Sequence, residues 1–316
     1  MTPQLRVERA ERFALAVDLG SGALKVGAVS LAGEVTAVAE AEIETERPVP
    51  GAAVQDASLW WERIRELSSE VLAGIPAERV VAVSCTGQWA STVPVDADGI
   101  PVGRCVTWLD TRGARYSREV VGGPVMGYAP GAIAAWIRRT AGVPSPHGGD
   151  PVSHMLFIDR EEPEVAAAAR WYMEPVDYLT MRFTGPAAAT HASMSAAWLT
   201  DNRHLDRLEY DAGLVRRAGL DIEKLPPLVE TGSVVGGVLP DVAAELGIDR
   251  GAQVVTGSPD LHSAALGTGA IRDGEPHMTI STTSWISLPY GRKKTDPLRS
   301  IATVPGLDSH SYLVAN

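Results

Sequence analysis

The stretch Thr256-Gly-Ser-Pro-Asp260-Leu-His-Ser-Ala-Ala-Leu-Gly-Thr-Gly269 decides how the chain is expected to fold. The apolar pair Val254-Val255 leads into a Gly-Ser-Pro loop, which delivers one carboxylate, Asp260, ahead of an Ala-rich, helix-like segment. Open α/β sheets place catalytic groups in this position, at the mouth of a strand just before a helix. A helix-capping Asp gives the same pattern, so the stretch alone leaves both interpretations open. The catalytic interpretation is supported by a similar stretch far upstream. There, Val17-Asp18-Leu-Gly-Ser21-Gly22 again puts an Asp and a small-residue loop after an apolar run.

Length and composition are those of a water-soluble globular protein of about two domains. The chain has 316 residues, 45% of them hydrophobic and 21% charged, with a net charge of −11. This charge argues against nucleic acid or an anionic membrane as the main partner, but not against a phosphate ligand held by local backbone groups. The sequence has no apolar run long enough to span a membrane and no signal-peptide pattern, and its two cysteines, Cys85 and Cys105, fit free thiols in a reducing compartment. We therefore expect a cytoplasmic protein.

Periodicity predicts a mixed α/β organisation. Residues 1–12 are expected to be a leader, 13–270 a first domain, and 271–316 the incomplete beginning of a second domain of the same type. Apolar runs and alternation predict strands, and apolar residues at helical spacing predict helices. The expected strands are Phe13–Val17, Lys25–Leu31, Val35–Ile43, Val80–Val83, Ser91–Val95, Met278–Ile280 and Trp285–Leu288; the expected helices are 57–73, Ala132–Arg139, Glu164–Ala169, Asp206–Ala218 and Asp241–Leu246.

The loops suit phosphate chemistry. Hairpins whose loops are Gly, Ser and Thr present backbone N–H groups with little steric bulk, which fits a phosphate tail held between two hairpins. With Asp18 for a hydrated Mg²⁺ and Asp260 as a proton acceptor, the chain has the minimum set for phosphoryl transfer. Ordinary turns and helix caps are the alternative. Gly20-Ser-Gly22-Ala-Leu-Lys25 starts like a dinucleotide-binding motif, but Lys25 stands at the third Gly position. The sequence has no Walker A, HExxH, CxxC or GxSxG motif.

Four ordered segments resemble the FGGY family of carbohydrate kinases, which has the actin-like, ribonuclease-H-like ATPase fold. The first is similar to the family's first phosphate motif, the second to its sugar-side signature, the third to the block that follows, and the fourth to the block of the catalytic Asp. In chain order they are Asp18-Leu-Gly-Ser-Gly-Ala-Leu-Lys25; Gly87-Gln88 with Val95-Asp96, Gly99 and Trp108-Leu-Asp110-Thr-Arg112; Trp171 with Pro175-Val-Asp177-Tyr178-Leu179 and Phe183-Thr184-Gly185; and Gly257-Ser-Pro-Asp260 with Ala264-Ala265 and Gly267-Thr-Gly269.

The resemblance implies ATP-dependent phosphorylation of a small sugar or polyol, with a pentulose such as xylulose favoured and Mg²⁺ as cofactor. It implies that Asp260 is the general base and that Asp18 helps to hold Mg²⁺. The residues expected to face the ATP phosphates are Gly20, Ser21, Gly22, Lys25, Thr283 and Ser284, and those expected on the sugar side are Gln88, Trp89, Asp110 and Arg112.

Three departures from the family pattern leave alternatives open. Trp89-Ala90 stands where xylulokinases have Met-His and glycerol kinases have Arg-Glu, and Thr282 stands where the second phosphate loop usually has Gly. The chain also stops within the first strands of the second domain, so we expect a fragment or truncated form that binds sugar weakly, binds Mg·ATP poorly and turns over near background. A sugar-binding remnant without nucleotide binding is the alternative function. The sugar-side signature disfavours another actin-like ATPase, and a homodimer remains open.

Overall fold

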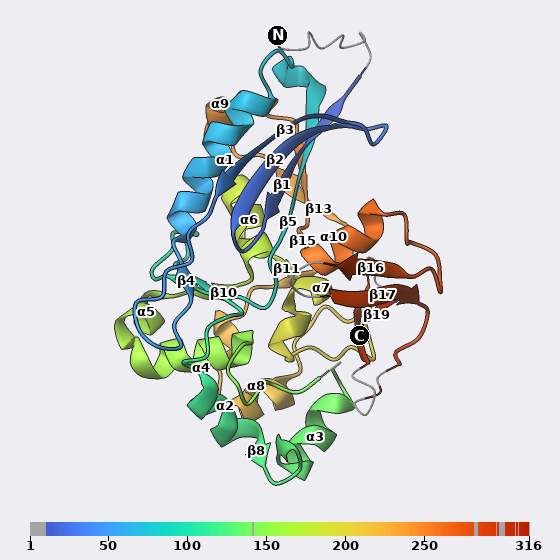
Figure 1. The fold of residues 1–316 in the computed structure, drawn as a ribbon. Coiled ribbons are helices and arrows are strands. Elements are labelled where there is room, and N and C mark those ends of the chain that lie inside the picture. Colours follow the sequence, from blue (N-terminus) through green and yellow to red (C-terminus); the bar gives the residue numbers. More distant parts are fainter. Residues whose placement is uncertain are drawn as a thin grey trace.

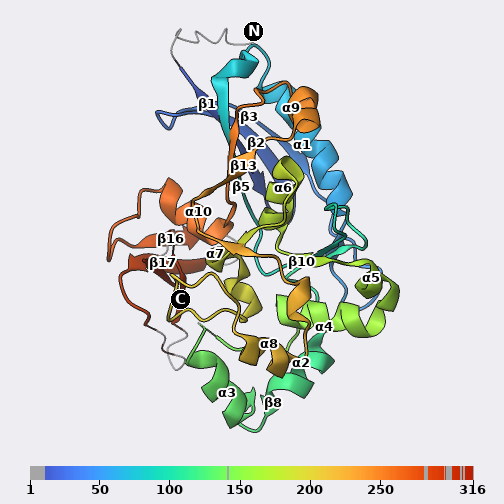
Figure 2. The same ribbon diagram turned by 180° about the vertical axis from the view of Figure 1, so that it is seen from behind.

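The molecule has a sheet-based upper lobe, a helical lower lobe and a small C-terminal sheet beside them (Figures 1 and 2). The computed structural model describes residues 11–140, 142–280, 284–294, 296, 301–306, 308 and 310–315. All but the last two residues of the predicted leader lie outside this part of the chain.

The upper lobe is a mixed sheet in the order β13-β14-β5-β1-β2-β3, with β15 also paired to β5. Strands β1 to β3 form an antiparallel meander, whereas β5 runs parallel to β1, and both β14 and β15 run parallel to β5. The predicted mixed sheet is therefore confirmed. Its strands are β1 (Phe13–Leu19), β2 (Ala23–Ser30), β3 (Val35–Glu42), β5 (Val80–Gly87), β13 (Val234–Gly237), β14 (Gln253–Val255) and β15 (Ser258–Pro259).

Alternation of apolar residues explains why this sheet forms. In β1, Phe13, Leu15, Val17 and Leu19 are all buried, and the residues between them are half-buried. Helix α1 (Ala57–Val71) contacts β2 and β3, and its Asp56 cap accepts a hydrogen bond from the backbone N–H of Ser58 at 2.9 Å. Helix α9 (Pro240–Leu246) contacts α1 and completes the hydrophobic core of this lobe.

The lower lobe is mainly helical and has its own hydrophobic core around Trp136, Val152, Met155 and Ile158. Several of its helices begin with Pro, whose missing N–H costs nothing in the first turn. The helices of the lower lobe are α2 (Ala114–Val121), α3 (Pro130–Ile137), α4 (Pro151–Glu161), α5 (Pro163–Ala168), α7 (His191–Met194) and α8 (Ala212–Ala218), with 3-10 turns at Ser195–Ala197 and Ile222–Lys224. Helix α6 (Pro175–Thr184) packs against β5, β13 and β14 of the upper sheet, and a further 3-10 turn at Ala77–Arg79 leads into β5. The chain also has four short strand pairs: β4 (Val54–Gln55) with β7 (Cys105–Val106), β6 (Val93–Val95) with β10 (Trp171–Met173), β8 (Gly122–Gly123) with β9 (Gly127–Tyr128), and β11 (Ala189–Thr190) with β12 (Leu228–Val229).

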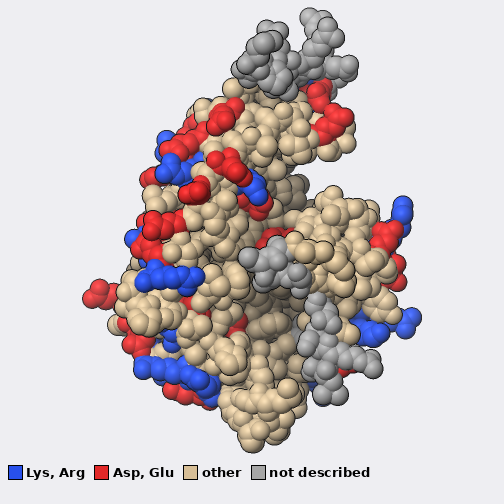
Figure 3. Space-filling view, in the orientation of Figure 1, with Lys and Arg blue, Asp and Glu red and all other residues tan. Residues whose placement is uncertain are grey.

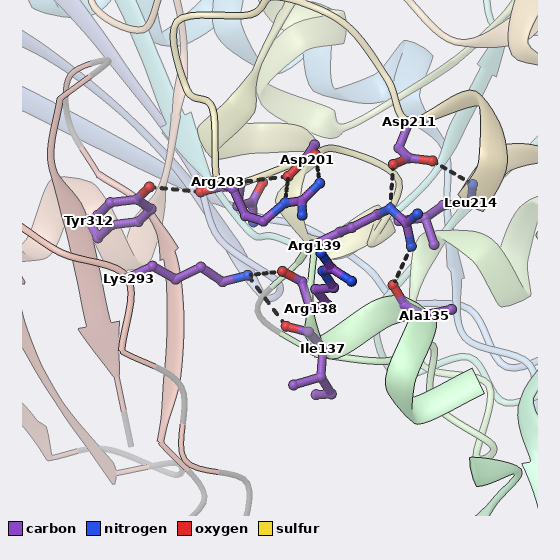
Figure 4. Close-up of polar contacts among 11 residues, drawn as sticks. Ala135, Ile137, Arg138, Arg139, Asp201, Arg203, Asp211, Leu214, Lys293 and Tyr312 are labelled. Atoms are coloured by element: carbon purple, nitrogen blue, oxygen red, sulfur yellow. Dashed lines mark hydrogen bonds and ion pairs between the residues drawn. The ribbon is translucent and has the colours of Figure 1, made fainter. Parts of the chain in front are cut away.

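Helix α10 (Asp260–Gly267) leads into an antiparallel sheet in the order β16-β17-β19-β18. Its strands are β16 (His277–Ile280), β17 (Ser284–Tyr290), β18 (Ala302–Pro305) and β19 (Tyr312–Ala315). Figure 4 shows how this sheet joins the lower lobe: Tyr312 Oη donates to the carbonyl of Asn202 at 2.8 Å, and Lys293 Nζ donates to the carbonyls of Ile137 and Arg138 at 3.4 and 3.3 Å. The small sheet therefore packs on the lower lobe through polar contacts.

One predicted helix is shorter than expected, and four α-helices of the described residues are unpredicted: α2, α4, α6 and the four-residue α7. The segment Asp206–Ala218 is helical only from Ala212, because the Asp211 side chain accepts the Leu214 N–H at 2.9 Å and starts the helix there. Helices α2, α4 and α6 lie where the sequence shows no amphipathic stripe of useful length. In α4 and α6 nearly every side chain is buried, so no polar face marks the helix.

Candidate active site

Asp18 and Asp260 lie at the same edge of the central sheet. Asp18 pairs in register with Thr86 of β5, and Thr86 in turn pairs with Ser258 of β15. The Thr86 hydroxyl donates to the Ser258 carbonyl at 2.8 Å, which fixes the two strands together. Three parallel strands thus bring the two stretches singled out in the sequence to one edge, which is the usual ligand position in such sheets.

The two carboxylates influence each other's charge. Asp260 is the first residue of α10, and its Oδ1 accepts only the adjacent Leu261 N–H, at 2.7 Å; the N-cap is Pro259, so Asp260 is not the helix cap. Burial raises the pKa of Asp260, the Leu261 N–H opposes this, and the negative charge of Asp18 raises the pKa further. Burial also raises the pKa of Asp18, and the Lys25 ammonium, opposite it on β2, lowers it.

The first hairpin turn is tied to the loops of the sugar-side signature. The Gly20 N–H closes the turn by donating to the carbonyl three residues further on, at 2.8 Å, and a side chain at Gly22 would meet no atom within 4 Å. The Ser21 hydroxyl accepts the Trp108 Nε1–H at 3.1 Å, and the Ser21 carbonyl accepts Gln55 Nε2–H at 2.8 Å. These hydrogen bonds therefore fix the turn at Ser21, while the space next to Gly22 stays open.

A groove of about 360 Å³ lies over one face of the central sheet, between β3 and α10, and Asp18, Lys25, Thr86 and Ser258 are among its lining residues. Figure 3 shows the molecule hollowed between the β1–β3 sheet and the lobe that carries α10 and β16. Of the two residues predicted for the second phosphate loop, Thr283 lies outside the described residues and Ser284 is the first residue of β17.

Gln88 is buried behind the first hairpin. Its backbone N–H donates to the Leu19 carbonyl at 2.6 Å and its Nε2–H to Gln55 Oε1 at 2.8 Å, whereas its Oε1 finds no hydrogen-bond partner in the part of the chain that the structure describes. The preceding Gly87 is required there, since a Cβ would lie 2.4 Å from the Leu19 carbonyl oxygen. Gln88 thus links the sugar-side signature to the phosphate hairpin through Gln55.

Trp89 lies against the helix that Asp260 begins. Its Nε1–H donates to the Ser193 carbonyl at 2.7 Å, and its ring meets the His262 ring edge-on at a centroid distance of 6.0 Å. It also packs on the small apolar cluster around Ala265. His262 donates from Nε2 to the Pro305 carbonyl at 2.7 Å, and burial lowers its pKa to about 4, so the ring is neutral at pH 7.

Asp110 and Arg112 stabilise their own loop through hydrogen bonds and an ion pair. Asp110 is fully buried, and its carboxylate accepts the backbone N–H of Ala53 at 2.9 Å and that of Arg112 at 2.9 Å. The Arg112 guanidinium forms an ion pair with the same carboxylate at 2.8 Å and lies 4.2 Å above the Phe157 ring. All these partners belong to the protein, so a contact of either residue with sugar stays a prediction.

The set of residues predicted from sequence omits two that face the same loops. Trp108 is 39% exposed, and its backbone N–H donates to the Ser91 hydroxyl at 3.2 Å. Glu174 is a buried carboxylate behind Ser91. Trp108 stands in the quoted Trp-Leu-Asp motif and could have been chosen from it, whereas no sequence pattern marks Glu174.

The donor set at this edge fits Mg²⁺. The negative charge of Asp18 raises the pKa of Asp260, so keeping both carboxylates ionised costs free energy, and a hard cation with oxygen ligands would relieve that repulsion. Within the described part of the chain, no group of three or more His, Cys, Asp or Glu side chains could hold a metal alone.

Comparisons with known proteins identify the fold and the family. The crystal structure of xylulose kinase from Rhodospirillum rubrum superimposes with a TM-score of 0.85 at 24% sequence identity, covering 96% of this chain and 60% of that one. The central sheet and its flanking helices therefore have the same fold as that structure. A family model, the N-terminal domain of the FGGY family of carbohydrate kinases, matches residues 13–267. The chain belongs to the FGGY family, as its four motifs predict.

Sequence relatives are carbohydrate kinases of greater length. A xylulose kinase of Streptomyces coelicolor is 32% identical over 248 residues, which make up 78% of this chain and 48% of that protein. A gluconokinase of Bacillus subtilis is 24% identical over 298 residues, 94% of this chain and 56% of that protein. The chain thus spans about half the length of the curated relatives it matches. The predicted domain boundaries at residues 12 and 270 remain predictions.

Proposed function

We propose that the chain acts in ATP-dependent phosphorylation of a small sugar or polyol, with a pentulose such as xylulose as the favoured substrate. The observation that carries this proposal is the meeting of Asp18 and Asp260 at the end of three parallel strands, between the glycine hairpin and the Trp89 loop. The family of the chain and the names of its relatives support it.

Asp260 is proposed as the general base. It accepts the proton of the sugar hydroxyl as that oxygen attacks the γ-phosphorus of ATP, and the bond between the γ-phosphorus and the bridging oxygen of ADP breaks. A pKa raised by burial and by Asp18 makes the carboxylate a stronger base than a free Asp while it remains accessible at the surface. The charge that develops on the phosphoryl oxygens needs compensation close to Asp260.

Asp18 and the first hairpin are proposed to supply that compensation. Mg²⁺ bound at Asp18 would bridge the phosphates and neutralise part of their charge. The backbone of Gly20, Ser21 and Gly22 lines the turn beside it, and the open space at Gly22 allows a phosphate to approach the main chain. Lys25, exposed on β2 opposite Asp18, adds a positive charge at the same edge.

Trp89 and Ala90 are proposed to shape the sugar pocket. A Trp ring offers an apolar face for the C–H side of a sugar, and Ala90 leaves room where a larger side chain would stand. The xylulose kinase relative is more similar in sequence than the gluconokinase, which favours a neutral pentulose over an aldonate. The remaining expectations, a cytoplasmic location and the open question of a homodimer, stay predictions. In the described residues, no helix is long and apolar enough to cross a membrane.

Calorimetric titration of the 316-residue chain with D-xylulose, D-gluconate and glycerol, each in separate runs beside Mg·ATP, tests the proposal. We expect D-xylulose to bind most tightly. In a full-length version of the kinase, sugar-dependent ADP formation is expected to fall by about 10²–10⁴ in Asp260→Asn and to be unchanged in the control Asp241→Asn, an exposed residue of α9, whereas the 316-residue chain alone should turn over near background. Failure of all three compounds to bind would refute the proposed function.

A further inference from the structure

Glu174 occupies an unusual position for a carboxylate. It stands between β10 and α6, is 1% exposed, and as the N-cap residue of α6 makes no side-chain capping bond. Its Oε2 instead accepts the backbone N–H of Ser91 at 3.2 Å, and the backbone amide of Ala90 also favours its ionised form. Among the described residues, its Oε1 has no hydrogen-bond partner. The Glu174 side chain thus hydrogen-bonds to the loop that contains Ser91 rather than capping its own helix.

The loop that Glu174 reaches has a strained turn. Ala90 has a φ of 59°, a left-handed conformation that residues with a Cβ rarely adopt. Such a turn makes successive backbone N–H groups point to the same side, where a single acceptor can bind both. Glu174 is that acceptor, so its carboxylate stabilises the conformation that Ala90 otherwise disfavours.

The flanks of this turn carry the residues proposed to meet the sugar. Trp89 precedes Ala90 and is fixed by its bond to the Ser193 carbonyl, and Gln88 precedes Trp89 and is fixed by Gln55. The Asp260 charge is close enough to Glu174 to raise its pKa. The left-handed turn therefore lies next to residues of the proposed sugar pocket and is held by the buried carboxylate.

We propose that Glu174 is a positioning residue that locks the left-handed turn at Ala90 and thereby sets the direction in which the 88–91 loop faces the sugar. The identity of the ligand as a sugar rests on the proposed function, whereas the contacts that hold the loop do not. Burial is the main reason that the pKa of Glu174 lies well above its usual value, and Asp177 and Asp260 add to it. A neutral carboxyl and a carboxamide have the same shape, so Glu174→Gln retains the acceptor oxygen.

Two measurements on the full chain test this. Amide hydrogen exchange at Ala90 and Ser91 is expected to be about tenfold faster or more in Glu174→Ala and close to wild type in Glu174→Gln, because one buried hydrogen bond and its strained turn are lost only in the first. The D-xylulose dissociation constant is expected to rise about tenfold in Glu174→Ala and less than about threefold in Glu174→Gln. Glu164→Ala, an exposed carboxylate in α5, is the control and should change neither.

The outcomes separate this inference from the proposed function. Unchanged exchange at Ala90 and Ser91 in Glu174→Ala overturns it, as does unchanged sugar affinity when the wild-type chain binds D-xylulose. A wild-type chain that binds no sugar refutes the proposed function, and the exchange experiment alone then decides whether Glu174 locks the turn. Should Glu174→Ala fail to fold, Glu174→Asp replaces it, since the shorter side chain withdraws the acceptor without removing the carboxyl group.

Discussion

Replacing Asp110 with alanine is expected to destabilise the fold strongly. The carboxylate is fully buried and satisfies the Ala53 N–H, the Arg112 N–H and the Arg112 guanidinium at 2.8 to 2.9 Å. Removal of one partner of a buried ion pair costs about 3–5 kcal/mol, and a buried N–H left without an acceptor costs about 1–3 kcal/mol. Arg112 keeps its stacking on Phe157 and lies 3.8 Å from Glu162, which offsets part of the loss. We expect a loss of about 3–5 kcal/mol.

The assay is urea denaturation followed by circular dichroism, with D-xylulose titration below the transition. Asp110→Asn keeps one acceptor oxygen and should lose only about 1–2 kcal/mol, and Asp98→Ala, on the exposed turn of the same signature, should lose less than about 0.5 kcal/mol. If Asp110→Ala keeps wild-type stability but loses sugar binding, the bracing role is wrong and Asp110 contacts the substrate.

Three further changes test other parts of the site. Asp18→Asn should weaken Mg·ATP binding at least tenfold and leave D-xylulose binding nearly intact, as measured by calorimetry; equal loss of both ligands would mean that Asp18 supports the fold. Trp89→Phe loses the bond to Ser193 and should abolish most of the fluorescence change that sugar causes, and an unaltered change would place the sugar elsewhere. Burial raises the pKa of Glu174, so the folded chain keeps a proton there that the unfolded chain releases above the usual pKa of 4.5. The free energy of unfolding should therefore fall as the pH rises above that value. The stability advantage of Glu174→Gln over wild type should therefore grow between pH 5 and pH 8 in urea denaturation, and a constant difference would contradict the burial of an ionisable group.

Elements with a clear apolar period could be predicted from the sequence. The β1–β3 meander and α1 follow strict alternation and helical spacing, and both are present within a few residues of the predicted bounds. Helices α4 and α6 have buried side chains on all sides, which removes the contrast between faces that periodicity needs. The 206–211 segment was wrongly included in a helix because its N-terminal limit depends on the Asp211 cap.

The candidate site shows the same division. The similarity of the two sequence stretches around Asp18 and Asp260 predicted that both carboxylates belong to one site. In the structure, parallel pairing of β1 and β15 with β5 brings them to one edge of the sheet. The partners of a buried carboxylate are set by tertiary contacts that a linear sequence does not carry. The contacts of Asp110 and Glu174 could therefore be seen only in the structure. The motif around Asp110 suggested a sugar ligand, but protein donors surround its carboxylate. No sequence motif marks Glu174.

The pH dependence of D-xylulose affinity in wild type and Asp260→Asn tests the central claim most directly. An ionised Asp260 accepts the sugar hydroxyl as a charge-assisted bond, which is about 1 kcal/mol stronger than a neutral one, or about fivefold in affinity. Since burial and Asp18 raise the pKa of Asp260, the loss on acidification should begin above the usual Asp range. The account predicts that wild-type affinity falls about three- to tenfold as this group takes up its proton, and that Asp260→Asn shows no such fall. The same pH dependence in both proteins, or no sugar binding by the wild type, would contradict it.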